Sequence, residues 1–309
     1  MLHAPTPAHV KRARLRERLA AGDLLIFPGA FNPLSAALIG DKGFDGVYIS
    51  GAVLSADLGL PDIGLTTLTE VAGRSQQIAR VTDLPALVDA DTGFGEPMNV
   101  ARTVHALEDA GVAGLHIEDQ VNPKRCGHLD GKQVVDTGTA TKRIRAAAQA
   151  RRDENLLIMA RTDIRAVEGP EAARDRAKAL VDAGADAIFP EAMRDLAEFE
   201  AMANAVDVPV LANMTEFGKS ELFTHDQLAS AGVQIIIHPV SLLRLAMGAA
   251  ERGLDILRGH GTLAPAVDQM QHRARLYELV DYEAYNAFDS SIFTYTPAPT
   301  PGTGNPTKE

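Results

Sequence analysis

The feature that most constrains the fold is an eightfold alternation of short apolar segments with longer amphipathic ones. The apolar segments, each expected to be a strand, are residues 23–29, 44–50, 86–91, 113–119, 156–162, 185–190, 208–213 and 233–238. The segments expected to be helices are 33–42, 66–81, 98–110, 139–152, 170–183, 195–205, 224–231 and 241–257. Several of these helices are followed by the glycine that commonly ends a helix, at Gly43, Gly111, Gly184 and Gly232. Eight strand-then-helix units predict a parallel (β/α)8 barrel of the TIM type.

A doubly wound open sheet is the alternative architecture. It is less favoured because there are eight units and no glycine pattern of a dinucleotide-binding turn. Beyond the eighth unit, residues 266–288 have apolar side chains near helical spacing, which predicts a further helix in an extension over about 259–290. We therefore expect one domain over residues 1–293. Residues 294–309, which are rich in Thr, Pro and Gly, are expected to be a disordered tail.

Charge and cysteine content restrict the class of function. The 41 acidic and 30 basic residues give a net charge of −11, which argues against nucleic-acid binding through a basic face. The single cysteine excludes an internal disulfide framework and fits a reduced, cytoplasmic environment. The basic run at 11–18 lacks the apolar core of a secretory signal and is expected to be a solvated helix face, a mitochondrial presequence being the less favoured alternative. The longest apolar stretch, 231–250, is interrupted by His238 and Arg244, so no membrane span is expected.

Polar side chains gather where the expected strands end, which is where a TIM barrel carries its active site. These residues are Tyr48, Ser50, Asp89, Asp91, His116, Glu118, Arg161, Glu191, Asn213 and Thr215. Residues two apart on a strand share a face, so Asp89 with Asp91, and His116 with Glu118, can point into one cup. Buried acids are costly unless they are paired or bind a cation, and oxygen ligands suit Mg²⁺, with Mn²⁺ as a substitute.

The only cysteine lies in the run Lys124-Arg125-Cys126-Gly127-His128, inside a loop over 121–133 that we expect to be a lid. A thiol among cations is a poised proton donor or nucleophile. Each feature alone has a plainer interpretation: a lone cysteine is more often a small buried hydrophobe, and Arg161 with Glu191 suits a structural ion pair. The catalytic interpretation is favoured because all these residues fall at one end of one predicted architecture.

Segments 58–62, 88–95, 114–120, 124–128, 159–163, 189–191 and 213–218 resemble the isocitrate lyase/phosphoenolpyruvate mutase superfamily. The resemblance runs from about residue 20 to 290, and within the superfamily it is strongest to the methylisocitrate lyase branch. The Lys-Arg-Cys-Gly-His run is typical of the lyases and absent from the phosphonate-processing members. The resemblance implies Mg²⁺-dependent cleavage of (2S,3R)-2-methylisocitrate, a small tricarboxylate, to pyruvate and succinate in propionate breakdown by the methylcitrate cycle. It also implies a homotetramer in which C-terminal helices are exchanged between subunits.

The resemblance further implies a role for each site residue. Asp89 would be the direct metal ligand, while Asp62, Asp91 and Glu118 would hold metal-bound waters. The residues expected to bind the substrate are Ser50, Gly51, Ala52, Arg125, Gly127, His128, Arg161, Phe189, Glu191, Asn213, Thr215, Ile237 and Arg244. One departure concerns the stretch after the second strand, which is often Ser-Gly-Gly-Gly in the family and is Ser50-Gly51-Ala52-Val53 here.

Cleaving a carbon–carbon bond beside a hydroxyl requires a base, a way to stabilise a carbanion and an acid. Cys126 is the expected acid, and Lys124, His128 and Arg161 are expected to stabilise the carbanion. The base is either Tyr48 or Glu118. Phe189 and Ile237 stand where isocitrate lyases typically have tryptophan and threonine, which favours a wider apolar wall with room for the extra methyl group. The alternatives are a related lyase acting on isocitrate, 2,3-dimethylmalate or oxaloacetate and, remotely, a non-catalytic metabolite-binding barrel.

Overall fold

The computed structural model describes residues 4–125 and 131–297, and it contains the expected (β/α)8 barrel. The eight strands are β1 (Leu25–Pro28), β2 (Val47–Ile49), β3 (Ala86–Asp89), β4 (Gly114–Glu118), β5 (Leu157–Thr162), β6 (Ala187–Pro190), β7 (Val210–Asn213) and β8 (Val233–His238). They form one parallel sheet in the order β1-β8-β7-β6-β5-β4-β3-β2. A bridge between Gly29 and Tyr48 brings β1 to β2, so the sheet is a nearly closed barrel.

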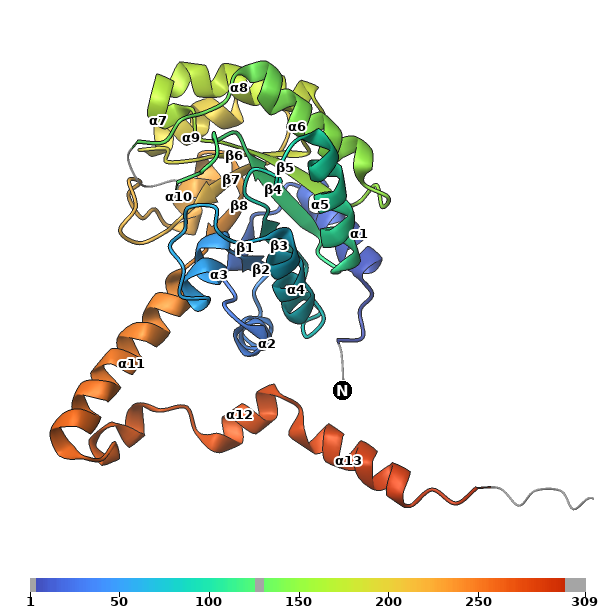
Figure 1. The fold of residues 1–309 in the computed structure, drawn as a ribbon, viewed down its shortest axis with the longest axis vertical. Helices are drawn as coiled ribbons and strands as arrows, with labels where there is room; N and C mark the ends of the chain where they lie inside the picture. The colour runs from blue at the N-terminus through green and yellow to red at the C-terminus, as the bar shows by residue number, and fades with distance from the viewer. Residues whose placement is uncertain (1–3, 126–130, 298–309) are drawn as a thin grey trace, which may run out of the picture. The chain divides into compact units, whose positions relative to one another are not determined.

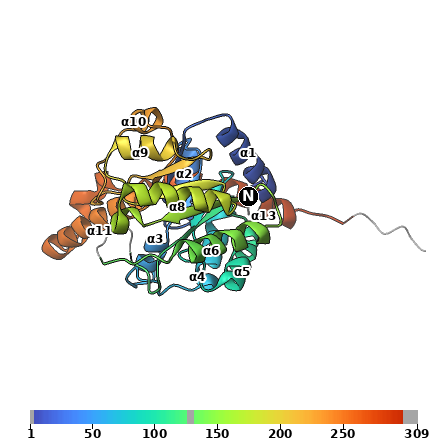
Figure 2. The same cartoon turned by 90° about the horizontal axis from the view of Figure 1, so that it is seen from above.

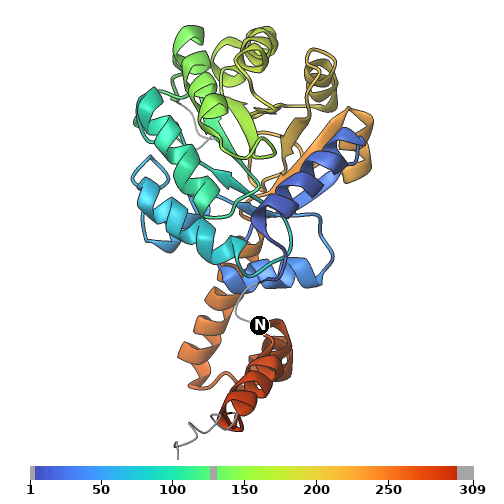
Figure 3. The ribbon, with the colours of Figure 1, turned by 90° about the vertical axis from the view of Figure 1, so that its right-hand side faces the viewer.

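Helices follow the strands around the outside of this barrel, except that the helix after β8, Ser241–His260, runs outward from it (Figure 1, Figure 2 and Figure 3). They are α2 (Pro33–Asp41), α3 (Gly51–Asp57), α4 (Leu68–Ala79), α5 (Pro97–Asp109), α6 (Thr137–Ala150), α7 (Arg165–Glu168), α8 (Pro170–Asp182), α9 (Leu196–Ala203), α10 (His225–Ser230) and α11 (Ser241–His260). The eight predicted helices are confirmed with slightly different ends. The short helices α3 and α7 were not predicted.

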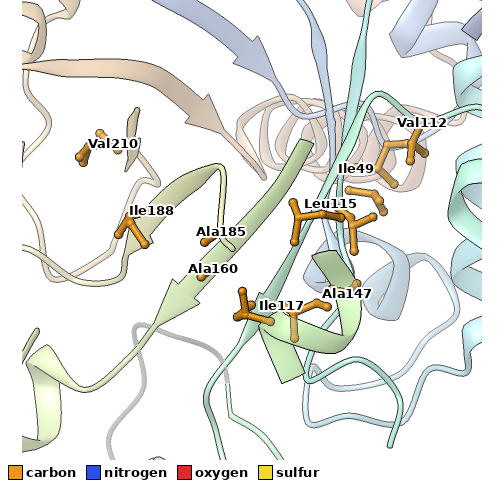
Figure 4. Packing of buried hydrophobic residues seen from close by; sticks show 14 of the residues in the cluster. Ile49, Val112, Leu115, Ile117, Ala147, Ala160, Ala185, Ile188 and Val210 are labelled. Carbon is orange, nitrogen blue, oxygen red and sulfur yellow. The ribbon is translucent and has the colours of Figure 1, made fainter. Parts of the chain in front are cut away.

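The strands bury both faces, which explains why they are nearly continuous apolar runs in the sequence. One face fills the barrel interior with side chains such as Phe27, Met159 and Ile235. The other face packs against the surrounding helices, where Leu115 and Ile117 of β4 meet Ala147 and other buried residues (Figure 4). The polar residues at the strand ends therefore stand on a rigid, doubly packed support.

Helix α1 (Ala8–Ala20) precedes the barrel, and its apolar side chains Leu15 and Leu19 belong to the barrel-interior cluster (Figure 3, dark blue). The prediction that the basic run of this helix is solvated was wrong for Lys11 and Arg12, which are each only 5% exposed. Lys11 donates to the carbonyl of Ala79 at 2.9 Å, and Arg12 to that of Glu108 at 2.7 Å. These carbonyls lie in the last turns of α4 and α5, where unpaired C=O groups attract cations.

The C-terminal region forms a separate compact unit that begins at residue 270. The single helix predicted over 266–288 was wrong. A 3₁₀ helix, η1 (Ala264–Gln269), ends the barrel unit, and α12 (Arg273–Leu279) and α13 (Tyr282–Phe293) make up the C-terminal one. Asp281 separates the last two helices because its backbone is left-handed, with φ of 56°. Across residues 4–125 and 131–297, no helix is both long and apolar enough to cross a membrane.

Candidate active site

A cavity of about 260 Å³ opens at the carboxyl ends of the strands. Its lining residues are Tyr48, Ser50, Ala52, Asp62, Asp89, Lys124, Arg161, Phe189, Glu191, Asn213, Thr215, Glu216, Phe217, Gly218, Pro239, Val240 and Arg244. Most of the site residues predicted from the sequence are thus brought together, from segments that are far apart in the chain. This is the end of the barrel at which enzymes of this architecture carry their catalytic groups.

Other predicted residues lie beside this cavity or outside the described chain. Gly51 lies next to Asp89, whereas Ile237 is buried in the barrel interior together with Phe189. Arg125 lines a neighbouring cavity of about 210 Å³. The predicted residues Cys126, Gly127 and His128 lie outside the described residues.

Asp89 and Asp91, at the end of strand β3 and just beyond it, are joined by a hydrogen bond. Asp89 ends the strand, and its Oδ1 accepts a hydrogen bond of 3.0 Å from the backbone N–H of Asp91, whose φ is 46°. Its Oδ2 lies 3.3 Å from the backbone N–H of Gly51, at the start of α3. A Cβ atom at position 51 would stand 3.0 Å from Asp89 Oδ2, so the missing side chain permits this close approach.

The ammonium group of Lys124 lies between the carboxylates of Asp62 and Asp91. Its Nζ is bonded to Asp62 and lies 2.8 Å from Asp91 Oδ1, and its side chain is 3% exposed. Burial opposes the charged ammonium, but Asp89, Asp91 and Glu118 outweigh burial and raise the pKa of Lys124. Burial, followed by the charge of Asp89, raises the pKa of Asp91 to about 6. A charged lysine is therefore held among carboxylates at neutral pH.

Tyr48 and His116 form a buried polar pair beside Asp89. The Tyr48 hydroxyl lies 2.7 Å from His116 Nε2, and His116 Nδ1 lies 3.7 Å from Asp89 Oδ1. Burial lowers the pKa of His116 to about 4, so the imidazole is neutral at neutral pH. Burial, together with the charge of Asp89, raises the pKa of the Tyr48 hydroxyl well above 10. Tyr48 is thus suited to donating a hydrogen bond and is a poor proton acceptor.

Arg161 stands at the end of β5 among three carboxylates. Its Nε and Nη2 form a fork on Asp163, at 3.0 and 3.2 Å. Nε also lies 3.3 Å from Glu118, and Nη2 lies 3.3 Å from Glu191. The guanidinium carbon is 5.2 Å from the centre of the Phe189 ring. The ion pair between Arg161 and Glu191, suggested by the sequence, is present, and it belongs to a wider network that also includes Asp163 and Glu118.

Glu118 is a buried acid that forms an ion pair with Arg161. It is 1% exposed, and neither carboxylate oxygen has a hydrogen-bond donor within residues 4–125 and 131–297. Burial raises the pKa of Glu118 well above its usual range, although Arg161 opposes this. A carboxylate whose pKa is raised by burial is a stronger base when it is ionised than one in water.

Arg244 of helix α11 also lines the cavity. Its Nη1 donates to Thr215 Oγ1 and to Glu216 Oε2, each at 2.9 Å. The ring of Phe217 lies 5.5 Å from this guanidinium. Asn213 Nδ2 lies 3.4 Å from Glu191 Oε2. Glu216 and Phe217 were not singled out from the sequence. The signal that could have found them is their place in the segment 213–218 that carries the family resemblance.

The donor set fits a hard divalent ion. Asp62, Asp89, Asp91 and Glu118 place four carboxyl groups near the ammonium of Lys124 and the guanidinium of Arg161, so the acids outnumber these two cations. Within residues 4–125 and 131–297, no group of three His, Cys, Asp or Glu side chains forms a ready-made ligand cluster. Mg²⁺ does not require one, because it usually keeps several waters and takes one or two carboxylates directly.

Comparison with known proteins gives a consistent result. Residues 15–257 match the family model described as phosphoenolpyruvate phosphomutase. The chain is 61% identical over 293 residues to a probable 2-methylisocitrate lyase of Corynebacterium glutamicum, covering 95% of this chain and 94% of that protein. A crystal structure of 2,3-dimethylmalate lyase has a TM-score of 0.85 at 33% identity, covering 94% of this chain and 96% of that one. A phosphonopyruvate hydrolase in complex with oxalate and Mg²⁺ has a TM-score of 0.84 at 27% identity, covering 92% and 99%.

Proposed function

The chain belongs to the phosphoenolpyruvate phosphomutase family and is an enzyme of the lyase class, and from that premise we propose that it cleaves (2S,3R)-2-methylisocitrate to pyruvate and succinate. The observation that carries the proposal is the meeting of acids with Lys124 and Arg161 in one small cavity. Such a cavity offers cations for the carboxylates of a tricarboxylate and oxygen ligands for a metal. We further propose a cytoplasmic homotetramer that acts in the methylcitrate cycle of propionate breakdown.

The proposed cofactor is Mg²⁺, with Mn²⁺ as a substitute. Asp89 would bind it directly, and Asp62, Asp91 and Glu118 would hold its waters. When bound, the ion supplies positive charge beside the reacting oxygens, which lowers the pKa of the substrate hydroxyl. The support is the excess of acids over cations in this cluster and the presence of Mg²⁺ in the complex of a related hydrolase.

The proposed reaction moves two protons. Glu118 accepts the proton of the C2 hydroxyl, the bond between C2 and C3 breaks, and its electron pair remains on C3 beside a carboxylate. We prefer Glu118 to Tyr48 as the base because burial raises the pKa values of both groups, which makes the carboxylate a better acceptor and keeps the phenol protonated. Arg161 and Lys124 stabilise the negative charge that develops on the succinate half.

Cys126 is the proposed acid. Its thiol donates a proton to C3, which yields succinate, and the thiolate is stabilised by the cations of the Lys-Arg-Cys-Gly-His run, His128 among them. The proton taken by the base then returns to the sulfur through solvent, so the cycle closes without any oxidant or reductant.

Discrimination between substrates would rest on the apolar part of the wall. Phe189 lines the cavity and would lie near the substrate methyl, whereas Ile237 does not line the cavity and would act only by packing in the same barrel-interior cluster as Phe189. Ala52 also lines the cavity, so its methyl group occupies space that a glycine would leave open. The likeness to 2,3-dimethylmalate lyase makes dimethylmalate the second candidate substrate.

The test is an assay of the purified protein with Mg²⁺ and, in parallel, 2-methylisocitrate, isocitrate, 2,3-dimethylmalate and oxaloacetate. We expect pyruvate and succinate from 2-methylisocitrate, with much lower kcat/KM on the others. The variant Cys126→Ser should bind Mg²⁺ and substrate but lose most turnover, and Asp89→Ala should lose Mg²⁺-dependent activity while remaining folded. Preference for another substrate would replace the proposed one, and wild-type turnover by Cys126→Ser would remove the acid assignment.

A further inference from the structure

Lys132 is a buried cation to which neither the family resemblance nor the proposed mechanism gives a role. Its side chain is 2% exposed, and its Nζ lies 2.7 Å from Oδ1 of Asp163, which is itself fully buried. Burying a lysine and an aspartate together is costly unless geometry and further hydrogen bonds compensate. The pair therefore calls for an explanation in terms of the groups that it contacts.

The backbone around Lys132 is fixed to the end of strand β4. The Val121 N–H donates to the Gln133 carbonyl at 2.9 Å, and the Val135 N–H donates to the Asp119 carbonyl at 2.8 Å. A bridge between Gln120 and Val134 lies between these two bonds. The backbone beside Lys132 is thus held by these antiparallel bonds, and the ammonium group itself is held by Asp163.

Asp163 links the ammonium group of Lys132 to Arg161, which lines the cavity. Its Oδ1 is shared between Lys132 and Arg161 Nη2, and its Oδ2 accepts from Arg161 Nε. Its backbone N–H donates to Asp119 Oδ1 at 2.9 Å, which fixes the main chain, while the bonds from Lys132 and Arg161 hold the carboxylate itself. Arg161 lines the cavity, and none of its bonds to Asp163, Glu118 or Glu191 uses Nη1.

Charge balance on this wall also depends on Lys132. Asp163, Glu118 and Glu191 each lie within 3.3 Å of the guanidinium of Arg161, so carboxylates outnumber guanidinium groups in this network. The ammonium of Lys132, which pairs with Asp163, offsets the negative charge of that carboxylate. An anionic ligand would be repelled more strongly if the ammonium charge were removed, because the interaction is poorly screened in a buried site.

We propose that Lys132 is a positioning residue: through Asp163 it fixes the guanidinium of Arg161 toward an anionic substrate and makes the wall less negative. The inference rests on the proposed function for the identity of the substrate. It concerns anion binding, however, and can be tested without turnover. Mg²⁺ binding should be independent of Lys132, because its ammonium pairs with Asp163 and not with Asp89 or Asp91.

The experiment measures oxalate binding by calorimetry in saturating Mg²⁺, Mg²⁺ binding alone, and KM and kcat with 2-methylisocitrate. In Lys132→Met we expect oxalate affinity to fall by about 10- to 100-fold, the range seen when a partner that orients a metal-binding side chain is removed. KM should rise by a similar factor while Mg²⁺ affinity stays unchanged. Lys132→Arg, which restores the charge, should recover most of the loss. Lys178→Met removes an exposed lysine of α8 and should behave as wild type.

A double-mutant cycle tests whether Lys132 acts through Asp163. Asp163→Asn should weaken oxalate binding as well, and Lys132→Met should add little in that background, because coupled residues are not additive. Additive effects, unchanged oxalate affinity in Lys132→Met, or equal losses of oxalate and Mg²⁺ affinity would each overturn the inference. If Lys132→Met does not fold, Lys132→Gln takes its place in the cycle. If the wild type binds oxalate but does not cleave 2-methylisocitrate, the proposed function fails and the inference about Lys132 is still decided.

Discussion

At the scale of single residues, the site depends on how closely backbone and carboxylate can approach. Gly51 begins α3 directly beside Asp89, and the space that a Cβ atom would need there is bounded by Asp89 Oδ2 at 3.0 Å and Asp91 Oδ1 at 3.4 Å. These are the acids proposed to face the metal. Adding one methyl group at position 51 should therefore weaken metal binding more than it lowers the stability of the fold.

The first prediction is that Gly51→Ala raises the Mg²⁺ concentration needed for half-maximal activity by about tenfold, the lower range for a change beside a metal ligand. The melting temperature should change little, because alanine is favourable in a helix. Gly73→Ala in α4 is the matched control, since no atom lies within 4 Å of its added Cβ. A wild-type Mg²⁺ requirement in Gly51→Ala would contradict the proposed role of Asp89.

A second residue-scale prediction concerns pH. His238, at the end of β8, lies with Nε2 3.2 Å from His225 Nε2, and burial, followed by the charge of His225, lowers its pKa although Glu216 opposes this. A folded-state pKa below the unfolded value of about 6.5 means that the unfolded chain binds the proton more readily, so stability is lost as pH falls below about 6.5. Urea unfolding between pH 7.5 and pH 5 should show a smaller loss of stability for His238→Gln than for wild type. His260→Gln, at an exposed position, should leave the wild-type slope, and an unchanged slope in His238→Gln would refute the assignment.

At the scale of elements, α1 lies outside the strands but contributes Leu15 and Leu19 to the barrel-interior cluster (Figure 3). Leu15 is 1% exposed and packs in the same cluster as Leu25 and Phe27. We predict that Leu15→Ala lowers the free energy of unfolding by about 2–5 kcal/mol, the usual cost of a large-to-small change in a core. Glu17→Ala, at an exposed position on the same helix, should change it by less than about 0.5 kcal/mol. Chemical denaturation measures both, and equal small effects would show that α1 does not support the barrel.

The elements also show how much of this molecule could be predicted from its sequence. The strands were predictable because both of their faces are buried. The spacing of Asp89 and Asp91 predicted a shared face, but Asp91 lies beyond the end of β3 with φ of 46°, so the two meet through the turn after the strand. Helix α3 was missed because it has only seven residues and begins right after β2. The contact between Lys132 and Asp163 joins a loop to a strand end, and no periodic pattern marks such a pair.

At the scale of the whole molecule, apolar side chains remain exposed on both units. Leu245 and Leu254 of α11 are exposed, as are Tyr285, Phe288 and Ile292 of α13. The last three are spaced by three and four residues and therefore share one face of their helix. Exposed apolar faces of this kind commonly mark interaction sites. The homotetramer with exchanged C-terminal helices, which the family resemblance implies, remains a prediction for which this face of α13 is the natural test.

The final prediction follows from that face. The double variant Phe288→Glu with Ile292→Glu places two charges where a subunit interface would bury apolar area, and burying unpaired charges is costly. Light scattering after size-exclusion chromatography should give a tetramer mass for wild type and a smaller mass for the variant at the same concentration. Ser290→Glu adds a charge to the opposite face of the same helix and should keep the wild-type mass. A variant that remains tetrameric would place the interface elsewhere, whereas a wild type that is monomeric at all concentrations would remove the assembly itself. Because an obligate oligomer gains stability from its partners, the variant should also unfold at a lower temperature if this face is buried in the assembly.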